Sequence, residues 1–489
     1  MNRAPEAREK EASMENFKRK ALISLISSYA SQFATTATNL ATKLILAHLI
    51  APGDLGVYAK ALFVQLGLEM LMDMGVTQHV ARENHRPYGA YLVIRVAAAL
   101  ILIAAVQIFG GVFSVWGAEL PNVSRALSII LLIKALSGVP NLYLERELMI
   151  QKSVLPQLLR LFTNGVVSII LARLNFGVWA LVCGAVTGEF TFAVFMWRSA
   201  WAYIPIDITW RHGGTLIWES RHLFAISLMG FALQQGDIAI TGSLLPNKQV
   251  GFYAMAYSLV IILSKVVEAA VYRVIYPLFC EYRDNISDLG NIYRRATLAV
   301  YALEAPIYMF LIFNARVIIP ALLGEKWRPA VPIIQLLSIY GIINPLPTFG
   351  NEILRAKKQD RLLTLSNVIG SVTLIVSGYL LTKSHGAEGM AIAKYIVIGS
   401  IPVVMSLYSS IRQDLILLVG QLALVYSIAV VGIGIVSLGF SFSAAAQVAA
   451  GTLFIPLIWI IYYYMFGSEI GTGALRNLRA DTVRVTEAD

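Results

Sequence analysis

The sequence predicts an all-α polytopic membrane protein with about fourteen transmembrane helices. Hydrophobic residues make up 57% of the 489 residues and charged residues only 14%, whereas soluble domains are nearer half apolar and a quarter charged. A helix that crosses a bilayer of about 30 Å needs roughly 20 mainly apolar residues. Stretches of this kind recur from Leu22 to Met465.

The spans follow from these stretches and from the polar segments that separate them. The fourteen predicted spans are residues 22–50, 57–79, 88–113, 126–144, 157–174, 178–201, 222–245, 253–276, 297–318, 330–349, 363–382, 389–408, 415–439 and 443–465. All the outward connections are short, so no soluble domain is expected there.

The positions of Lys and Arg orient the chain. With the N-terminus in the cytoplasm, 23 of the 39 Lys and Arg residues fall in cytoplasmic segments and 5 in outward ones. Basic segments stay cytoplasmic, so both termini are expected on that side. The net charge of +10 then reflects topology, and no nucleic-acid partner is expected. No apolar run with a cleavage site follows residues 1–20, which predicts a cytoplasmic tail and not a signal peptide.

An internal repeat predicts the domain organisation. The segment PGDLGVYAKA at 52–61 resembles PNKQVGFYAMA at 246–256, each following a span. Duplication explains the shared pattern better than coincidence, and it predicts two six-helix lobes in the same orientation. The predicted parts are an N-terminal tail (1–20), an N-lobe (21–201), a cytoplasmic linker (202–221), a C-lobe (222–410), two further spans (411–466) and a cytoplasmic tail (467–489).

Polar side chains line one face of spans 1 and 7. In span 1 they are Ser28, Gln32, Thr35, Thr36, Asn39, Thr42 and Lys43, and in span 7 they are Ser227, Gln234, Asp237 and Thr241. Such residues often hydrogen-bond neighbouring membrane helices. A stripe that includes amides and a charge favours a water-filled cavity instead.

Several carboxylates lie within the spans and are candidates for coupling to H⁺ or Na⁺. They are Asp73, Asp237, Glu268 and Glu304, and Asp73 and Glu268 occupy matching positions in the two copies of the repeat. A carboxylate in a low-dielectric cavity can exchange a proton near neutral pH. The alternative is structural: Glu268 pairs with Lys265 or Arg273 and only holds span 8 in register.

Catalytic and metal-binding patterns are not found. The sequence has no phosphate-binding loop ending in Gly-Lys-Ser/Thr and no His or Cys cluster with metal-ligand spacing. No enzyme activity, metal or cofactor is therefore expected. The two cysteines, Cys183 and Cys280, are interpreted as packing residues that form no disulfide framework.

Four short motifs resemble those of a transporter family. They are LIAPGDLGVYA at 49–59, DMG at 73–75, LLGEKW at 322–327 and GAEGMA at 386–391. In this order and placement they resemble the Wzx-like polysaccharide exporters, or flippases, of the multidrug/oligosaccharidyl-lipid/polysaccharide (MOP) superfamily, over residues 20–465.

The resemblance implies a function. Two lobes would face a central cavity and alternate between inward-open and outward-open states. They would move undecaprenyl-diphosphate-linked oligosaccharides from the cytoplasmic to the periplasmic leaflet of a bacterial inner membrane, for surface or exopolysaccharide biosynthesis. Besides membrane lipids, polysaccharide polymerase machinery is a candidate partner.

Such a substrate suggests its own contacts. A diphosphate needs cations, for which the candidates are Lys43, Arg95, Lys134, Lys265 and Lys394. A sugar needs amide and hydroxyl partners, for which the candidates include Gln32, Asn39 and Gln234.

Two alternatives remain. A cation-coupled multidrug exporter would share the fold, although such transporters usually have twelve spans and a cavity dominated by acidic groups. A membrane polymerase or ligase of lipid-linked sugars would need a sizeable outer domain, which the predicted topology does not provide.

Overall fold

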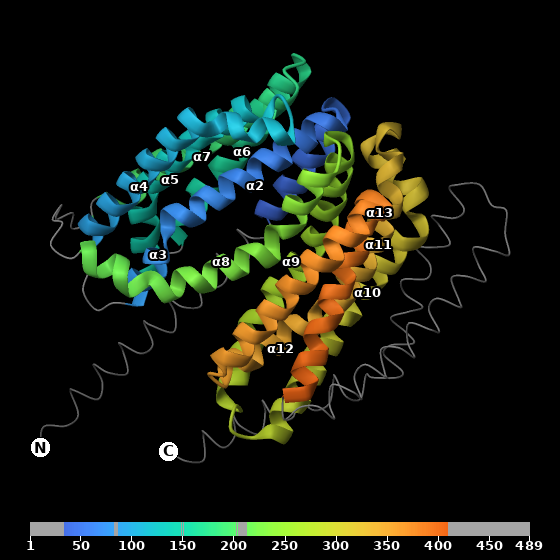
Figure 1. Ribbon diagram of the computed structural model, residues 1–489. Coiled ribbons are helices and arrows are strands. Elements are labelled where there is room, and N and C mark those ends of the chain that lie inside the picture. The colour runs from blue at the N-terminus through green and yellow to red at the C-terminus, as the bar shows by residue number, and fades with distance from the viewer. Residues whose placement is uncertain are drawn as a thin grey trace, which may run out of the picture. The chain divides into compact units, whose positions relative to one another are not determined.

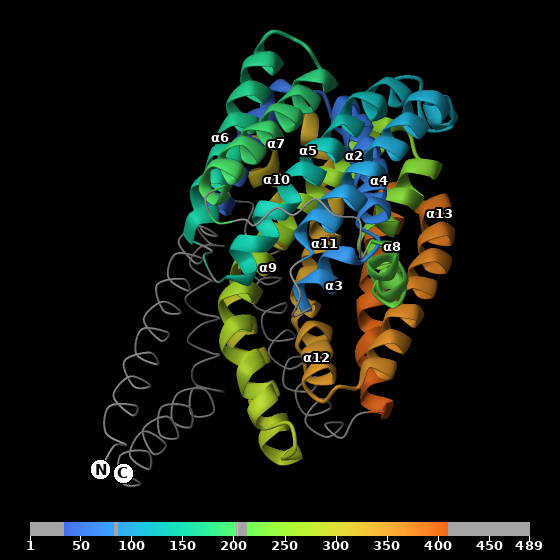
Figure 2. The same ribbon diagram turned by 90° about the vertical axis from the view of Figure 1, so that its left-hand side faces the viewer.

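The computed structural model describes residues 34–408, except for short gaps at 83–86, 148, 150, 202 and 204–212. The described residues are helical almost throughout (Figures 1 and 2). The predicted spans at 415–439 and 443–465 and both predicted tails lie outside the described residues, as does Gln32.

The helices before residue 245 follow the predicted spans. They are a helix over 34–49, α2 (Pro52–Asp73), α3 (Val76–Arg82), α4 (Tyr88–Phe109), the 3-10 helix η1 (Gly110–Trp116), α5 (Leu120–Arg146), α6 (Gln151–Arg173), α7 (Val178–Ala200) and α8 (Gly213–Leu244). The predicted span 57–79 is therefore two helices, α2 and α3.

The later helices are longer and more broken. They are α9 (Asn247–Glu281), α10 (Ile286–Leu323), the 3-10 helix η2 (Glu325–Ala330), α11 (Val331–Ile343), α12 (Pro345–Ala356) and α13 (Asp360–Tyr408). In the described part of the chain, eight helices, or nine if a bent pair in α8 is one span, are long and apolar enough to cross a membrane. The all-α membrane class is thus confirmed, while the count of fourteen stays a prediction.

The chain divides into two compact units. The first ends at Gly251 and the second begins at Phe252. In the first unit α5 contacts α2, α4 and α7, while α8 contacts α2, α3 and α4. Half of the predicted linker at 202–221 lies outside the described residues, and its last part, 213–221, belongs to α8. The lobe boundaries stay predictions.

Small residues set the close packing of α6 against α7 in the first unit. A Cβ atom at Gly184 would lie 1.9 Å from the Ser168 hydroxyl, and one at Gly188 would lie 2.9 Å from the Arg160 carbonyl oxygen. Membrane helices approach closely where such residues face each other, because van der Waals packing drives their association.

Within the first unit, the start of one copy of the repeated motif, 52–56, contacts the start of the other, 247–251. A Cβ atom at Gly56 would lie 1.8 Å from the Asn247 carbonyl oxygen, and one at Gly251 would lie 1.8 Å from the Pro52 carbonyl oxygen. Each glycine thus packs against the backbone four residues before the other. The contact is reciprocal, although the duplication itself stays a prediction.

In the second unit, α13 reverses direction at Gly386, whose φ is 62° and ψ is −140°. A Cβ atom at Gly389 would lie 1.9 Å from the Leu381 carbonyl oxygen. Residues eight apart in a straight helix are about 12 Å apart, so the chain must fold back here. The two halves of α13 therefore correspond to the predicted spans 363–382 and 389–408.

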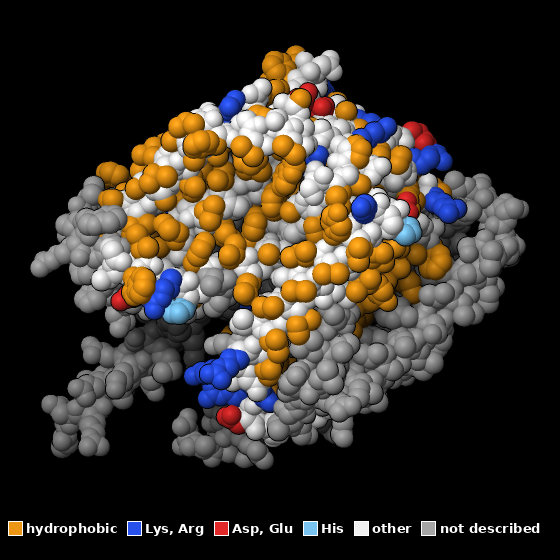
Figure 3. All heavy atoms as spheres, viewed as in Figure 1, with side chains coloured by type: hydrophobic (Ala, Val, Ile, Leu, Met, Phe, Trp, Pro, Cys, Tyr) orange, Lys and Arg blue, Asp and Glu red, His pale blue; other side chains and the backbone are white. Residues whose placement is uncertain are grey.

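Apolar side chains cover much of the surface. On α4 and α6 the exposed large side chains include Leu100, Ile101, Ile108, Phe162 and Ile170. Figure 3 shows this hydrophobic surface extending over the helices of the first unit. Exposed apolar area on this scale is typical of helices that face lipid.

Candidate functional site on helices α2, α4 and α5

A helix break places Asp73 at the centre of a polar network. Asp73 ends α2, and Met74 and Gly75 follow with φ values of 46° and 75°. A Cβ atom at Gly75 would lie 2.8 Å from the backbone nitrogen of Phe224 in α8. Glycine therefore serves both the left-handed turn and the close approach of α8. The DMG motif thus ends α2 beside a neighbouring helix.

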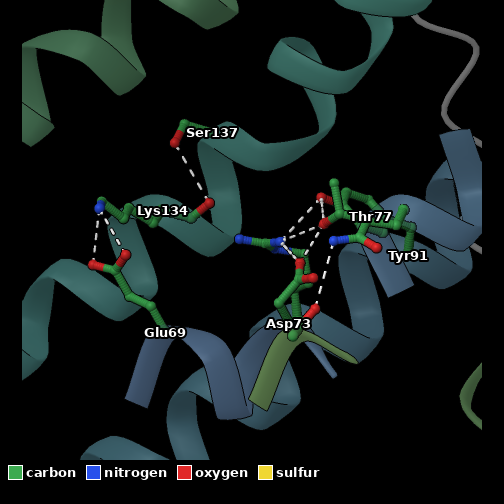
Figure 4. A network of polar contacts seen from close by, with 9 residues as sticks. Glu69, Asp73, Thr77, Tyr91, Lys134 and Ser137 are labelled. Carbon is green, nitrogen blue, oxygen red and sulfur yellow. Dashed lines mark hydrogen bonds and ion pairs between the residues drawn. The ribbon is translucent and has the colours of Figure 1, made fainter. Parts of the chain in front are cut away.

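Asp73 forms an ion pair with Arg95 of α4 (Figure 4). Nη1 of Arg95 lies 2.5 Å from Oδ1 of Asp73 and donates to the Thr77 hydroxyl at 2.8 Å and to the Tyr91 hydroxyl at 3.1 Å. The Thr77 hydroxyl also donates to Asp73. Side-chain exposure is 11% for Arg95 and 27% for Asp73. The pair is therefore largely shielded from solvent.

Gly138 of α5 makes room for this network. A Cβ atom there would lie 3.1 Å from Nε of Arg95 and 3.1 Å from the Tyr91 hydroxyl oxygen. The absence of a side chain at Gly138 lets the guanidinium lie between α4 and α5.

A second ion pair lies one turn earlier on α2. Nζ of Lys134 in α5 lies 2.8 Å from Oε1 and 2.9 Å from Oε2 of Glu69. Nε2 of Gln65 donates to Oε1 of Glu69 at 3.3 Å. Gln65 is 2% exposed. In the described part of the chain, neither its Oε1 nor Nε of Arg95 has a hydrogen-bond partner.

These groups form one continuous feature, here named the α2 polar track. It consists of Gln65, Glu69, Asp73 and Thr77, spaced four residues apart, with Lys134 and Arg95 as cationic partners. A spacing of four residues places Gln65, Glu69 and Asp73 on one side of α2, and a hydrogen bond to Asp73 joins Thr77 of α3 to them. The charges of the two pairs cancel, so the track presents ionic groups without a net charge.

The track brings together three of the predicted site residues. Arg95 and Lys134, which were expected to contact phosphate, each hold a carboxylate, and Asp73, which was expected to couple ions, is one of those carboxylates. An anionic ligand that approached the cations would therefore compete with Asp73 and Glu69.

Other predicted residues of the first unit lie elsewhere. Asn39 and Lys43 are half-buried in the helix over 34–49. In α8, Gln234 is exposed, whereas Asp237 is 1% exposed and accepts a hydrogen bond from the Ile238 backbone nitrogen at 2.8 Å. The roles predicted for these four residues stay predictions.

The predicted residues of the second unit lie on three helices. Lys394 of α13 is 4% exposed, and its Nζ lies 5.0 Å from the centre of the Tyr257 ring. Glu304 of α10 is 2% exposed. Lys265 and Glu268 belong to α9, and their side chains lie outside the described part of the structure.

One buried cation was not singled out from the sequence. Lys60 of α2 is 3% exposed, and its Nζ donates to the carbonyl oxygens of Trp116 at 2.9 Å and Leu245 at 3.4 Å. It thereby joins the ends of η1 and α8 to α2. Its position inside the predicted span 57–79 was the available signal, because a lysine there needs polar partners.

Comparison with known proteins relates the chain to polysaccharide biosynthesis. A family model described as polysaccharide biosynthesis protein matches residues 45–332. The succinoglycan biosynthesis transport protein ExoT of Rhizobium meliloti is 24% identical over 340 residues, which is 66% of each chain. The lipopolysaccharide biosynthesis protein WzxC of Escherichia coli is 21% identical over 193 residues, 40% of this chain and 39% of WzxC. The matched stretches therefore cover about two thirds or less of these relatives.

Two solved structures share the fold. The lipid II flippase MurJ in an inward closed conformation gives a TM-score of 0.71 at 14% identity, covering 91% of this chain and 98% of MurJ. An inward-facing multidrug resistance MATE family transporter of the MOP superfamily gives a TM-score of 0.60 at 18% identity, covering 78% and 95%. Identity this low shows the fold alone. The predicted fold class is thus confirmed, and the match over 45–332 places the chain in a family of polysaccharide biosynthesis proteins, as predicted.

Proposed function

From the premise that this chain belongs to the polysaccharide biosynthesis protein family, we propose that it is a flippase for undecaprenyl-diphosphate-linked oligosaccharides. It moves repeat units from the cytoplasmic to the periplasmic leaflet by alternating access. The α2 polar track is the observation that supports this proposal most. Ionic side chains inside an apolar membrane bundle are costly and usually functional, and the track holds two ion pairs there.

The track offers cations that a diphosphate can take over. With no substrate bound, Glu69 and Asp73 neutralise Lys134 and Arg95, so no unpaired charge lies in a medium of low dielectric. A diphosphate that binds these cations supplies the same negative charge, and the freed carboxylates then need H⁺ or Na⁺. Substrate binding and ion binding are thereby coupled through one set of side chains.

The remaining predicted residues complete this proposal. Lys43, Lys265 and Lys394 are further candidates for the phosphates, and Gln32, Asn39 and Gln234 for the sugars. Asp237, Glu268 and Glu304 are further candidates for ion coupling. The polyprenyl chain remains in lipid.

The proposed location is a bacterial inner membrane with both termini in the cytoplasm. Segments predicted to face outward meet in the first unit, where a Cβ atom at Gly117 would lie 3.4 Å from the Asn247 side chain. Segments predicted to face inward meet through His79 and Glu219, whose side chains lie 3.1 Å apart. Both contacts support the alternating topology. Polysaccharide polymerase machinery remains a proposed partner.

Flipping by reconstituted protein tests the proposal. Proteoliposomes that contain a fluorescent undecaprenyl-diphosphate-linked oligosaccharide report flipping through the access of a membrane-impermeant quencher. Lys134→Ala removes a charged hydrogen bond worth about 1.5–3 kcal/mol, so flipping should slow by about tenfold or more. Lys248→Ala, an exposed lysine outside the track, is the matched control and should flip at the parent rate.

If folded Lys134→Ala protein flips the glycan lipid at the parent rate, Lys134 only forms a structural ion pair with Glu69. The same vesicles also test the multidrug alternative. Export of a cationic dye without any flipping of the glycan lipid would replace the proposed function.

Ion coupling needs a separate experiment, with a pH or Na⁺ gradient imposed on the vesicles. Asp73→Asn and Glu268→Gln keep the side-chain size and abolish titration. At least one variant should lose the stimulation by the gradient. If both keep it at the parent level, neither carboxylate couples an ion, and Asp237 and Glu304 are the next residues to replace.

A further inference from the structure

A basic pocket lies in the second unit, between the residues that follow α9 and the turn from α12 to α13. Its volume is about 450 Å³, within the range of about 300–1,000 Å³ that is usual for small-molecule sites. Its lining consists of Arg283, Asp284, Ala356, Lys357, Lys358 and Gln359. Figure 3 shows a cluster of basic side chains at this end of α12.

The lining is suited to an anion. Ala356 is the single apolar residue among the lining residues, which include three cations and one carboxylate. Asp284 is 93% exposed, and its Oδ2 lies 3.5 Å from Nε of Arg283, which leaves other guanidinium donors available. Guanidinium and ammonium groups bind phosphate oxygens through charge-assisted hydrogen bonds.

The backbone places one of these cations at a strained position. Lys358 has a φ of 55°. Its nitrogen donates to the Arg355 carbonyl oxygen at 3.0 Å, and the Gln359 nitrogen donates to the Leu354 carbonyl oxygen at 2.8 Å. This left-handed helix end usually takes glycine, because a Cβ atom is unfavourable there. A lysine at such a position is typical of a site where function outweighs strain.

The neighbouring Arg355 has a different role. Its Nη1 binds Oε1 of Glu352 at 2.8 Å on the same helix. Arg355 does not line the pocket. The basic lining therefore leaves out a cation that lies at the same end of α12.

We propose that this pocket binds the phosphate group of a phosphate-bearing anion. It is a second site, in a different unit from the α2 polar track, and it goes beyond the proposed flipping function. Its ligand is either the headgroup of an anionic lipid or a soluble phosphate compound. Under the proposed topology both lining segments are cytoplasmic, where these two sources meet. Binding in detergent does not depend on that topology.

Calorimetric titration of the purified full-length protein with inorganic diphosphate tests the proposal at constant ionic strength. The parent protein should bind. Lys358→Gly removes one cation and relieves the strained backbone, so the affinity should fall about tenfold while the melting temperature stays the same or rises. Lost binding then cannot be attributed to unfolding. Arg361→Ala removes an exposed cation outside the lining and should leave the affinity unchanged.

Two results would overturn the proposal. One is that the parent protein shows no saturable binding of diphosphate. The other is that Arg361→Ala weakens binding as much as Lys358→Gly, which would indicate a diffuse positive surface without a pocket site.

A further titration distinguishes the two sources of the ligand. Nanodiscs of phosphatidylcholine are compared with nanodiscs that also contain phosphatidylglycerol. Diphosphate should bind about tenfold more weakly in the second kind if lipid headgroups occupy the pocket. Equal affinity in both would identify a soluble anion as the ligand. Neither titration measures flipping, so the site and the flippase proposal can fail separately.

Discussion

Ion pairs between distant residues decide how the candidate site is built. The spacing of Gln65, Glu69 and Asp73 in the sequence, four residues apart, is enough to place them on one face of a helix. It did not predict that Arg95 holds Asp73 or that Lys134 holds Glu69. Those partners come from α4 and α5, and the relative register of neighbouring helices leaves no periodic signal in the sequence.

The Lys134–Glu69 pair can be separated into its structural and functional roles. Lys134→Met leaves Glu69 without its cation and should destabilise the protein. Breaking a fully buried pair costs about 3–5 kcal/mol, and the loss here should be smaller because both side chains are partly exposed. Adding Glu69→Leu replaces both charges by apolar groups and should restore the melting temperature. Flipping should stay lost in both variants, because the phosphate contact is missing. Flipping that recovers along with stability would mean that the pair is structural.

Gly138 offers a prediction that alters no charge. Gly138→Ala places a methyl group against Arg95 and Tyr91 and should cost about 1–3 kcal/mol through overpacking. Gly53→Ala is the matched control, since a Cβ atom there has no neighbour within 4 Å. In a helix it should be neutral or stabilise by up to about 1 kcal/mol. Thermal unfolding in one detergent compares the two, and equal melting temperatures would argue against a role for Gly138.

At the scale of helices, long apolar stretches predicted where helices are present better than where they end. Every predicted span from 57–79 to 389–408 overlaps an observed helix. The span 330–349 is broken, because α11 ends at Ile343 and α12 begins at Pro345. Proline favours the first turn of a helix, and that local preference is not visible in an average of hydrophobicity. Lys60 shows the same limit, since its partners are carbonyl oxygens that only the fold identifies.

The contact between α2 and the start of α9 predicts a non-additive pair of substitutions. Gly56→Ala and Gly251→Ala each place a Cβ atom 1.8 Å from a carbonyl oxygen. Each Cβ atom would clash with backbone and not with a flexible side chain. Each substitution should therefore lower the free energy of unfolding by at least about 1–3 kcal/mol, the usual cost of overpacking.

The double variant should lose less free energy of unfolding than the two single variants lose together, since both substitutions push the same two segments apart. Unfolding of the two single variants, the double variant and the parent forms a complete cycle. Strict additivity would mean that the two glycines do not share a contact.

At the scale of the whole molecule, the alternating topology is a prediction from the apolar spans and from the positions of Lys and Arg. The structure adds contacts within the first unit. The segments around Gly117 and Asn247 meet at one end, and His79 and Glu219 meet at the other. Sidedness itself is a property of the membrane and of insertion, so it needs a labelling experiment.

Single cysteines in intact cells provide that experiment. With Cys183 and Cys280 replaced by serine, Lys248→Cys and Lys383→Cys should react with a thiol reagent that cannot cross the inner membrane, because both positions are exposed and predicted periplasmic. Lys358→Cys is also exposed but lies in a basic segment that is predicted to be cytoplasmic. It should react only after the cells are permeabilised. Labelling of Lys358→Cys in intact cells would invert the second unit and place the basic pocket outside, whereas failure at Lys383→Cys alone would contradict the predicted pairing of the two halves of α13.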